Sequence, residues 1–400
     1  MPLAPCRHDA HRFRHGVLAL LLSLATGLAA LAGEATAQSP APFESKAKHA
    51  ILMDSGSGKV LFEKKADELM HPASMSKIMT AIMVFERLKS GRLSLDDEFV
   101  VSENAWRRGG ATSGGSTMYA ELGSRIRLED LLKGVIVHSG NDACIIIAEG
   151  IAGSEEAFAD LMTQRARELG LEKSTFKNST GLTDPEHQMT ARELALLARY
   201  LIEVYPEYYK FYSIPEFTWN GITQPNRNPL LGSYPGADGI KTGYVSAAGY
   251  GLSGSGKRDG RRLIMVIAGL ASTRERADEA QKLLDWGFRQ YRTVELYQAG
   301  DPVGRARVWG GSERWVDLAA KDDVRLALSD EEKESTTVEV AYDGPLRAPV
   351  EKGAEVGTVR FKVDGRVISE SPLVTRQGVD AAAPMWSRAV DSVAYMIFGG

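Results

Sequence analysis

The stretch HPASMSKIMT, residues 71–80, places Ser74 three residues before Lys77 in a run rich in methionine and isoleucine. The pattern predicts a helix over about 75–88 that ends before Gly91. Residues three apart lie on one face of a helix, so the hydroxyl and the amine are expected to be neighbours. The pair is therefore either an N-cap serine followed by a solvated lysine, or a nucleophile with its base.

A second motif lies in HSGNDA, residues 138–143, between two predicted helices. It contains Ser139 and, two residues later, Asn141. A second hydroxyl can pass a proton between a lysine and a leaving nitrogen. An asparagine amide has both donors and acceptors, so it can orient the base and bind a substrate backbone. The motif therefore supplies what a serine–lysine pair would need.

A third motif lies in DGIKTGYVSAAGYGL, residues 238–252, and reads Lys241-Thr242-Gly243. We expect it at the start of a strand, because the residues after it are typical of one. A cation and a hydroxyl on a strand suit the binding of a substrate carboxylate. The glycine beside them allows a substrate backbone to approach closely, as in strand addition.

The order S-x-x-K, S-x-N, K-T-G is far more specific than any one of its parts. With these motifs the chain resembles the low-molecular-mass penicillin-binding proteins, the serine-type D-alanyl-D-alanine carboxypeptidases. The resemblance covers nearly the whole chain. It includes the segments PASMSKIMTA, LLKGVIVHSGNDAC, FKNSTGLTDPEHQMTARELA and DGIKTGYVSAAGYGL.

The resemblance implies a role for each motif residue. Ser74 would be acylated by the penultimate D-Ala of a peptidoglycan stem peptide, with Lys77 as its base. Ser139 and Asn141 would complete the proton path and hold the substrate. The substrate-binding residues implied on the carboxylate side are Lys241, Thr242, Gly243, Arg227 and Arg276. The same residues would receive β-lactam antibiotics, which act as covalent inhibitors of the family.

The oxyanion hole implied by the resemblance uses the backbone N–H groups of Ser74 and Tyr244. Some members of the family carry histidine at the position of Tyr244. The backbone donor survives this difference, whereas substrate preference and rate depend on the side chain. The Glu-x-x-Leu-Asn loop of class A β-lactamases has no counterpart between Ser139 and Lys241, so we expect slow hydrolysis of penicillin.

Three alternatives to the carboxypeptidase are open. A D,D-endopeptidase of the same fold would cut D-Ala cross-links, although such members often lack a β domain. A β-lactamase would acylate and then turn over rapidly. A catalytically silent wall-binding protein would need no intact site, yet all three motifs are present in this chain.

Composition excludes other classes of function. The 400 residues are 44% hydrophobic and 25% charged with a net charge of −4, and nucleic-acid binding would require a basic domain or stripe. The histidines after residue 37 are scattered and no H-E-x-x-H occurs, so a zinc site is not expected. The run GLSGSGKR, 251–258, lacks the Ser or Thr of a phosphate loop because Arg258 follows the lysine. Neither a metal nor an organic cofactor is expected.

The segment order predicts an α+β fold. Two opening strands, a helical block, further strands and a closing helix indicate one antiparallel sheet covered by helices, as in β-lactamases and transpeptidases. We assign this serine peptidase domain to residues 40–295. Residues 296–380 alternate in short runs broken by turns, which predicts a small β-sandwich domain without catalytic residues.

Both ends of the chain indicate an exported protein. Residues 1–37 have a basic region, an apolar run and an A-x-A site, which is typical of a cleaved signal peptide. Residues 384–400 place Trp386, Val390, Val393 and Ile397 on one helical face, which predicts an amphipathic helix lying on a membrane or packed on the β domain. We expect a peripheral protein on the periplasmic face of the inner membrane.

Overall fold

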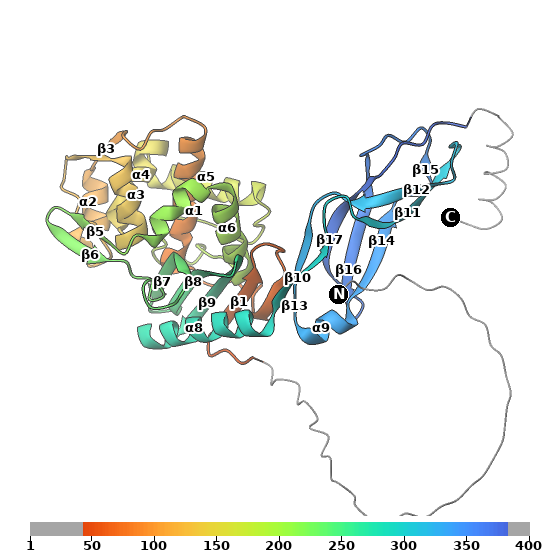
Figure 1. Ribbon diagram of the computed structural model, residues 1–400. Helices are drawn as coiled ribbons and strands as arrows, with labels where there is room; N and C mark the ends of the chain where they lie inside the picture. Colours follow the sequence, from red (N-terminus) through yellow and green to blue (C-terminus); the bar gives the residue numbers. More distant parts are fainter. Residues whose placement is uncertain (1–42, 383–400) are drawn as a thin grey trace, which may run out of the picture. The chain divides into compact units, whose positions relative to one another are not determined.

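The computed structural model describes residues 43–382, so the expected signal peptide and the expected helix over 384–400 lie outside it. No helix within the described range is both long and apolar enough to cross a membrane. The first domain is built on a five-stranded antiparallel sheet of order β2-β1-β9-β8-β7 (Figure 1). Its strands are β1 (His49–Asp54), β2 (Val60–Lys64), β7 (Ala237–Val245), β8 (Gly249–Arg258) and β9 (Arg261–Leu270).

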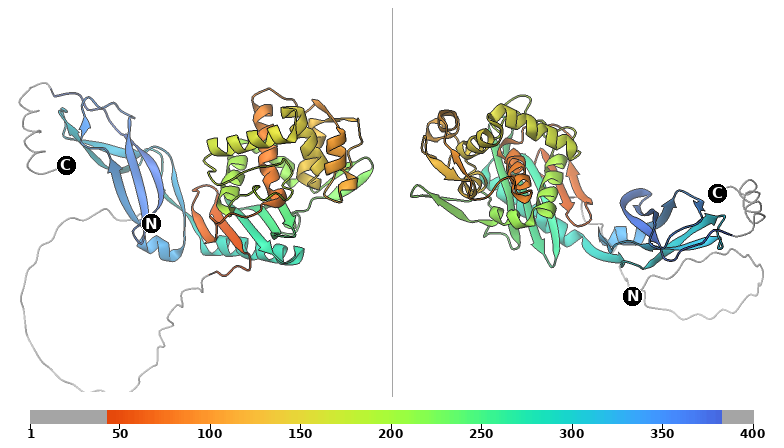
Figure 2. Two further views of the ribbon diagram at one scale, coloured as in Figure 1. Left: turned by 180° about the vertical axis from the view of Figure 1, so that it is seen from behind. Right: turned by 90° about the horizontal axis from the view of Figure 1, so that it is seen from above.

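Helices cover both faces of this sheet, and the side chains of each strand alternate between them. Helix α8 (Thr273–Gln290) packs on one face, where Leu52 of β1 meets Leu283 and Leu284 (Figures 1 and 2). On the other face Ile51 joins a larger apolar cluster with the helical block. Each fully buried aliphatic side chain contributes roughly 1.5–3 kcal/mol, so both layers are firmly held.

The helical block lies between β2 and β7 in the sequence. It also contains two short antiparallel pairs of strands that the sequence does not predict: β3 with β4, which are separated in the chain by α2 and η2, and the β5–β6 hairpin. Its helices are η1 (Ala73–Ser76), α1 (Lys77–Lys89), α2 (Glu103–Gly109), η2 (Ala111–Ser113), α3 (Leu128–Lys133), η3 (Gly134–His138), α4 (Asn141–Ala152), α5 (Glu155–Glu168), α6 (Ala191–Val204), α7 (Pro206–Tyr209) and η4 (Lys210–Ser213). The hairpin strands are β3 (Glu98–Val100), β4 (Arg125–Arg127), β5 (Glu216–Trp219) and β6 (Ile222–Pro225).

Residues from Arg292 onward form the β domain, which has its own apolar core. Its main sheet has the order β14-β16-β17-β12-β11-β15, and β10 pairs with β13 beside it. Its elements are β10 (Arg292–Tyr297), β11 (Pro302–Trp309), β12 (Trp315–Ala320), β13 (Val324–Leu328), α9 (Asp330–Ser335), β14 (Thr337–Tyr342), β15 (Leu346–Arg347), β16 (Glu355–Val363) and β17 (Arg366–Thr375). The α+β class and the β character of this region are confirmed.

Two local predictions need correction. The helix expected over 75–88 begins at Lys77, because Ala73 has a positive φ of 49° and the residues after it form a 3₁₀ turn. The K-T-G motif lies in the middle of β7, whereas we expected it at the start of a strand. The run GLSGSGKR forms β8 and leads into β9, as expected for a hairpin and not for a phosphate loop.

Candidate active site

The first two predicted residues meet at the junction of η1 and α1. Ser74 lies in the 3₁₀ turn, and Lys77 is the first residue of the helix. Lys77 Nζ lies 2.8 Å from Ser74 Oγ and 2.8 Å from Asn141 Oδ1, and it also donates to the carbonyl of Thr180. The serine therefore has an amine within hydrogen-bond reach, which is the first requirement for an activated nucleophile.

Lys77 is 1% exposed. Burial, with Arg227 nearby, lowers the pKa of its amine to about 8. A neutral amine has two hydrogens and one lone pair. It can keep donating to Asn141 and to the Thr180 carbonyl while its lone pair accepts the hydroxyl proton of Ser74. The three contacts thus fit a base that takes a proton from Ser74 without losing its other partners.

The S-x-N motif sits where one helix ends and the next begins. Residues Gly134–His138 form a π-helical turn, and Ser139 follows with a left-handed φ of 59°. Such a conformation is uncommon for a residue other than glycine and often occurs at functional sites. Asn141 then opens α4, and its side-chain oxygen accepts the hydrogen bond from Lys77. The break between helices thus directs Asn141 toward Lys77 and places Ser139 on the same cavity as Ser74.

Strand β7 carries the third motif at the open edge of the sheet. An edge strand has unpaired backbone groups that can bind an extended peptide. Lys241 and Thr242 are both buried, and burial holds the pKa of the Lys241 amine well below its usual range. A Cβ at Gly243 would lie 2.8 Å from the Pro72 carbonyl oxygen, so the glycine lets β7 approach the turn that carries Ser74.

A cavity of about 430 Å³ opens in front of these residues. Its lining brings together residues from the three motifs and beyond: Ser74, Ser116, Ser139, Arg227, Thr242, Gly243, Tyr244, Tyr250, Thr273 and Arg276. Lys77, Asn141 and Lys241 are buried behind it. The structure therefore places every predicted site residue in or directly behind one cavity.

Two arginines give the cavity a positive end. Within residues 43–382 neither Arg227 nor Arg276 forms an ion pair with a carboxylate, although Arg227 contacts the Ser116 hydroxyl. Arg276 is 7% exposed, and its Nε has no hydrogen-bond partner. Desolvation lowers the pKa of both guanidinium groups, which nevertheless remain charged. Two desolvated cations without an acidic partner favour an anionic ligand group at this end.

Aromatic side chains form the wall beside β7. The rings of Tyr244 and Tyr250 lie 4.3 Å apart between centroids, and Tyr244 is 53% exposed. The guanidinium of Arg276 lies 5.8 Å from the Tyr250 ring. The side chain of Tyr244 thus faces the cavity while its backbone belongs to β7.

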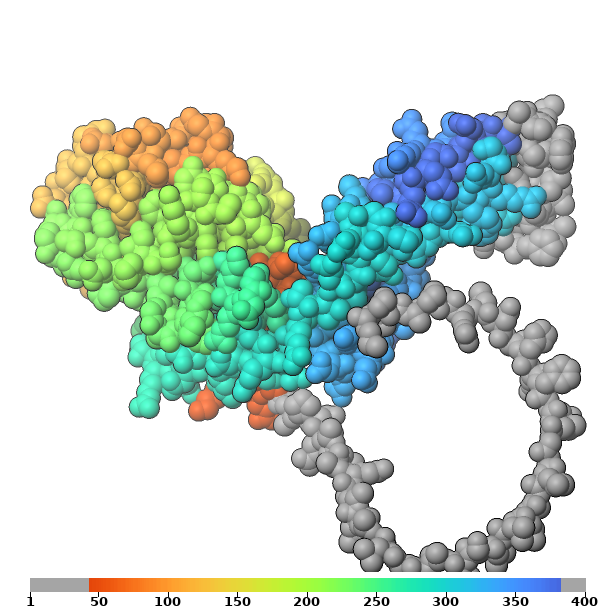
Figure 3. Space-filling view, in the orientation of Figure 1, coloured from red at the N-terminus to blue at the C-terminus, as the bar shows by residue number. Residues whose placement is uncertain are grey.

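Several residues that shape the site carry no motif that predicts their role. Asp142, fully buried, accepts hydrogen bonds from Met118 N, Ala120 N and Thr117 Oγ1. It thereby holds the loop that brings Ser116 to the cavity. The β5–β6 hairpin supports the same loop, because Asn220 Nδ2 donates to the Tyr119 carbonyl and Gln224 Nε2 donates to the Thr117 carbonyl. The green and orange segments adjoin in Figure 3. An aspartate right after a site asparagine is the only signal that could have suggested this role.

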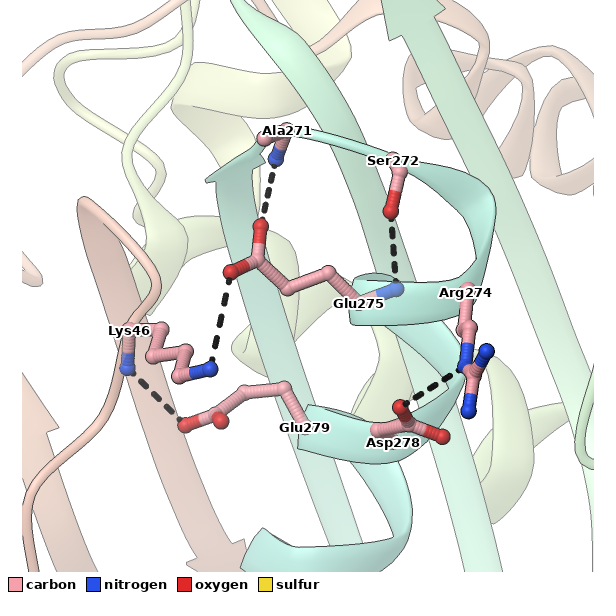
Figure 4. Close-up of a pocket in the computed structure, with 7 residues that line it drawn as sticks. All are labelled: Lys46, Ala271, Ser272, Arg274, Glu275, Asp278 and Glu279. Atoms are coloured by element: carbon pink, nitrogen blue, oxygen red, sulfur yellow. Dashed lines mark hydrogen bonds and ion pairs between the residues drawn. The ribbon is translucent and has the colours of Figure 1, made fainter.

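A second hollow at the start of α8 has no such chemistry (Figure 4). Ser272 caps the helix by accepting from Glu275 N, the Glu275 carboxylate accepts from Ala271 N, and Glu279 accepts from Lys46 N at 3.1 Å. The charged groups of Lys46 and Glu275 lie 4.0 Å apart. These contacts anchor the first described residues to α8, so we regard the cluster as structural.

The remaining nucleophilic and metal-binding residue types are also structural. Cys144 is buried, and burial raises the pKa of its thiol to about 12, so it is not a reactive thiolate. Burial lowers the pKa of His187 to about 4, and its Nδ1 accepts from Lys177 N. Across residues 43–382 no cluster of His, Cys, Asp and Glu side chains could hold a metal ion.

Sequence comparison agrees with this geometry. Residues 34–272 match the peptidase family described as D-alanyl-D-alanine carboxypeptidase. The chain belongs to this family. Residues 291–381 match the family described as the C-terminal domain of penicillin-binding protein 5. The resemblance inferred from the three motifs is therefore confirmed.

Individual relatives cover most of the chain. D-alanyl-D-alanine carboxypeptidase DacC of Escherichia coli is 40% identical over 90% of this chain and 92% of its own length. D-alanyl-D-alanine carboxypeptidase DacF of Bacillus subtilis is 36% identical over 84% of this chain and 87% of its own length. The crystal structure of penicillin-binding protein 5 from Haemophilus influenzae is 35% identical, covers 85% of this chain and 99% of that one, and has a TM-score of 0.77.

Proposed function

We propose that the chain is a serine-type D-alanyl-D-alanine carboxypeptidase that removes the terminal D-Ala from peptidoglycan pentapeptides through an acyl-enzyme on Ser74. Removal of this residue limits cross-linking, because it takes away the bond that cross-linking enzymes use. The observation that carries the proposal is the 2.8 Å contact between Ser74 Oγ and Lys77 Nζ at a cavity that Arg227 and Arg276 also line. The family and the named relatives support the same substrate class.

In the first half of the reaction neutral Lys77 takes the hydroxyl proton of Ser74, and Oγ attacks the carbonyl carbon of the penultimate D-Ala. The N–H groups of Ser74 and Tyr244 stabilise the resulting oxyanion. The proton passes from Lys77 by way of Ser139 to the nitrogen of the terminal D-Ala. The C–N bond breaks, free D-Ala leaves, and an ester joins the shortened peptide to Ser74.

In the second half a water molecule attacks the ester carbonyl and gives a proton to Lys77. The bond to Ser74 Oγ breaks, the proton returns to that oxygen, and the tetrapeptide leaves with a new carboxylate. The carboxylate of the intact substrate would bind Thr242 and Lys241 with Arg227 and Arg276. The carboxylate of a β-lactam would bind there too, with Ser74 opening the lactam ring.

Mass spectrometry of a muropeptide mixture tests this function. The mixture contains pentapeptide monomers and cross-linked dimers and is incubated with the chain from residue 38 onward. Pentapeptides should each lose one alanine. Dimers falling to monomers would instead indicate an endopeptidase, and rapid turnover of penicillin after an acylation burst would indicate a β-lactamase. If neither pentapeptides nor dimers change and the protein is shown to be folded, the result would favour the catalytically silent wall-binding protein.

We further propose that the protein is exported and acts at the periplasmic face of the inner membrane as a peripheral protein. The signal-like pattern of residues 1–37 and the amphipathic pattern of residues 384–400 support this proposal. The domain assignment of 40–295 and 296–380 would then place the enzyme between an N-terminal signal peptide and a C-terminal membrane contact.

A further inference from the structure

One end of the β domain carries an exposed tryptophan. Trp315 is 50% exposed at the start of β12, where it lies opposite Arg307 of β11. Half-buried Trp309 lies at the end of β11 and pairs with Arg347 of β15. We call this end, formed by residues 307–315, 343–349 and 376–382, the tryptophan tip. An exposed indole is unusual on a soluble protein and is enriched where proteins meet lipid headgroups.

The register of the sheet locates this end. Strands β12 and β17 pair Leu318 with Thr375 and Ala320 with Leu373, so β12 starts beyond the end of β17. The β16–β17 turn, where Val363 pairs with Arg366, lies at the other end of the same sheet. The tryptophan tip and that turn are therefore at opposite ends of the β domain.

The last described residues run along the tryptophan tip. Ser312 N donates to the carbonyl of Asp380 at 2.7 Å, and Ala382 N donates to the carbonyl of Gly310 at 2.8 Å. Residues 384–400, with their amphipathic pattern, begin two positions later. A helix lying on a membrane would thus start close to the β11–β12 turn of the tip, where Ala382 contacts Gly310. The tip would then face the same surface.

The charge of the tip is compatible with a lipid surface. Arg305, next to it, already pairs with Asp317 at 3.1 Å. The tip carries the arginines Arg307, Arg347 and Arg376 beside the carboxylates of Glu313, Asp343 and Asp380. The opposite end also has exposed apolar side chains, Val338 and Val367, but no aromatic one. Aromatic and arginine side chains together suit the interface between headgroups and acyl chains.

We propose that the tryptophan tip is a second membrane-contacting element, in which Trp315 enters the headgroup region of the bilayer on which residues 384–400 lie. This inference rests on the membrane association proposed above. Two contacts would hold the β domain more firmly than the terminal segment alone, because the second contact forms at the high effective concentration set by the first.

Vesicles of phosphatidylethanolamine with a minority of phosphatidylglycerol test the proposal, using the chain from residue 38 to 400. Trp315→Ser should lower the vesicle partition coefficient about fivefold to tenfold, since an apolar contact of this size is lost. Trp315→Phe should keep most of the affinity. Val338→Ser, at the opposite end of the domain, is the matched control and should bind like the unchanged chain.

A site-directed label reports the contact directly. Cys144 is the only cysteine after residue 37 and is fully buried, so one added cysteine can be labelled selectively. A polarity-sensitive dye on Ser312→Cys should shift its emission to the blue with vesicles and be quenched by nitroxide lipids. The same dye on Thr337→Cys, at the opposite end, should not respond.

The outcomes separate this inference from the membrane association on which it rests. If the chain binds vesicles but neither Trp315→Ser nor the label at 312 responds, the tip proposal fails and membrane association stands. If the chain does not bind at all, both fail. The dye at residue 312 could instead be shifted to the blue in the absence of vesicles. If that shift disappears when the chain ends at residue 382, the chain's own C-terminal segment covers the tip, which would contradict the proposal. If the emission shift in the absence of vesicles instead grows with protein concentration, a second copy of the chain covers the tip, which would also contradict the proposal.

Discussion

Ser74 and Ser76 share one 3₁₀ turn but differ in what their hydroxyls contact. Ser74 Oγ faces Lys77 and the cavity, whereas buried Ser76 Oγ donates to the Ala73 carbonyl at 3.0 Å. Ser74→Ala should abolish both D-Ala release and covalent labelling by penicillin, because no other hydroxyl occupies its place. Gel fluorescence with a labelled penicillin checks this. Ser76→Ala is the matched control and should still be labelled, and labelling of Ser74→Ala would disprove the assignment of the nucleophile.

The protonation of Lys77 should set the pH dependence of acylation. Burial lowers the pKa of its amine to about 8, and only the neutral amine can act as the base. The second-order rate of acylation should therefore rise about tenfold per pH unit below this pKa and level off above it. Stopped-flow measurement with a chromogenic cephalosporin gives the profile.

The variant Lys77→Arg tests whether Lys77 is needed as a base or only as a positive charge. Arginine keeps the positive charge but does not lose its proton in proteins, so this variant should not be acylated at any pH tested. A profile that stays flat in the unchanged enzyme between about pH 6 and 9 would exclude Lys77 as the titrating base.

Tyr244 offers its backbone N–H and its ring for different purposes. The N–H is the proposed oxyanion donor, and the exposed ring contacts the ring of Tyr250 in a tilted arrangement. Tyr244→His keeps the N–H and changes the wall of the cavity, so the rate on a D-Ala-D-Ala peptide should shift several-fold without being lost. Steady-state kinetics of D-Ala release measures it. A dead variant would mean that the side chain itself is required.

At the scale of elements, the site depends on the close approach of β7 to the turn that carries Ser74. A Cβ at Gly243 would lie 2.8 Å from the Pro72 carbonyl oxygen and 3.1 Å from Ala73 Cβ. Gly243→Ala should therefore push the two elements apart and lower acylation by roughly a hundredfold, since a misplacement of about 1 Å can cost this much. Acylation rate and thermal melting are measured together.

Gly256 provides the matched control on the neighbouring strand. A Cβ there would have its nearest neighbour at 3.6 Å, an ordinary contact. Gly256→Ala should keep the acylation rate. Equal losses in both variants would show that the sheet tolerates no added side chain, and the specific role of Gly243 would be contradicted.

Prediction of elements succeeds where the local pattern is strong. The β1–β2 hairpin, the strands β8 and β9, and the closing helix α8 all follow from periodicity and turn residues. The β5–β6 hairpin and the π-helical turn before Ser139 are not predicted, since they depend on contacts across the chain. Gln224 Nε2, for example, donates to the carbonyl of Thr117, more than a hundred residues away.

At the scale of the whole molecule, the C-terminal segment should decide where the enzyme is found. Ending the chain at residue 383 should move the protein from the membrane to the soluble fraction while activity on a soluble peptide is kept, because the cavity lies within residues 74–276. Cell fractionation with penicillin labelling of both fractions checks this. An unchanged membrane fraction would mean that residues 384–400 pack on the β domain, as the alternative interpretation has it.

The order of three short motifs by itself indicated the family and the motif residues of the site, and the order of the segments indicated the fold class. Such motifs are readable because the chemistry demands particular side chains at close spacing within each segment. Only the tertiary structure decided how the segments meet. Lys77 reaches Asn141 and the Thr180 carbonyl, and Arg227 and Arg276 are left without carboxylate partners in the described residues. These distances depend on packing between segments far apart in the chain, which no local pattern encodes.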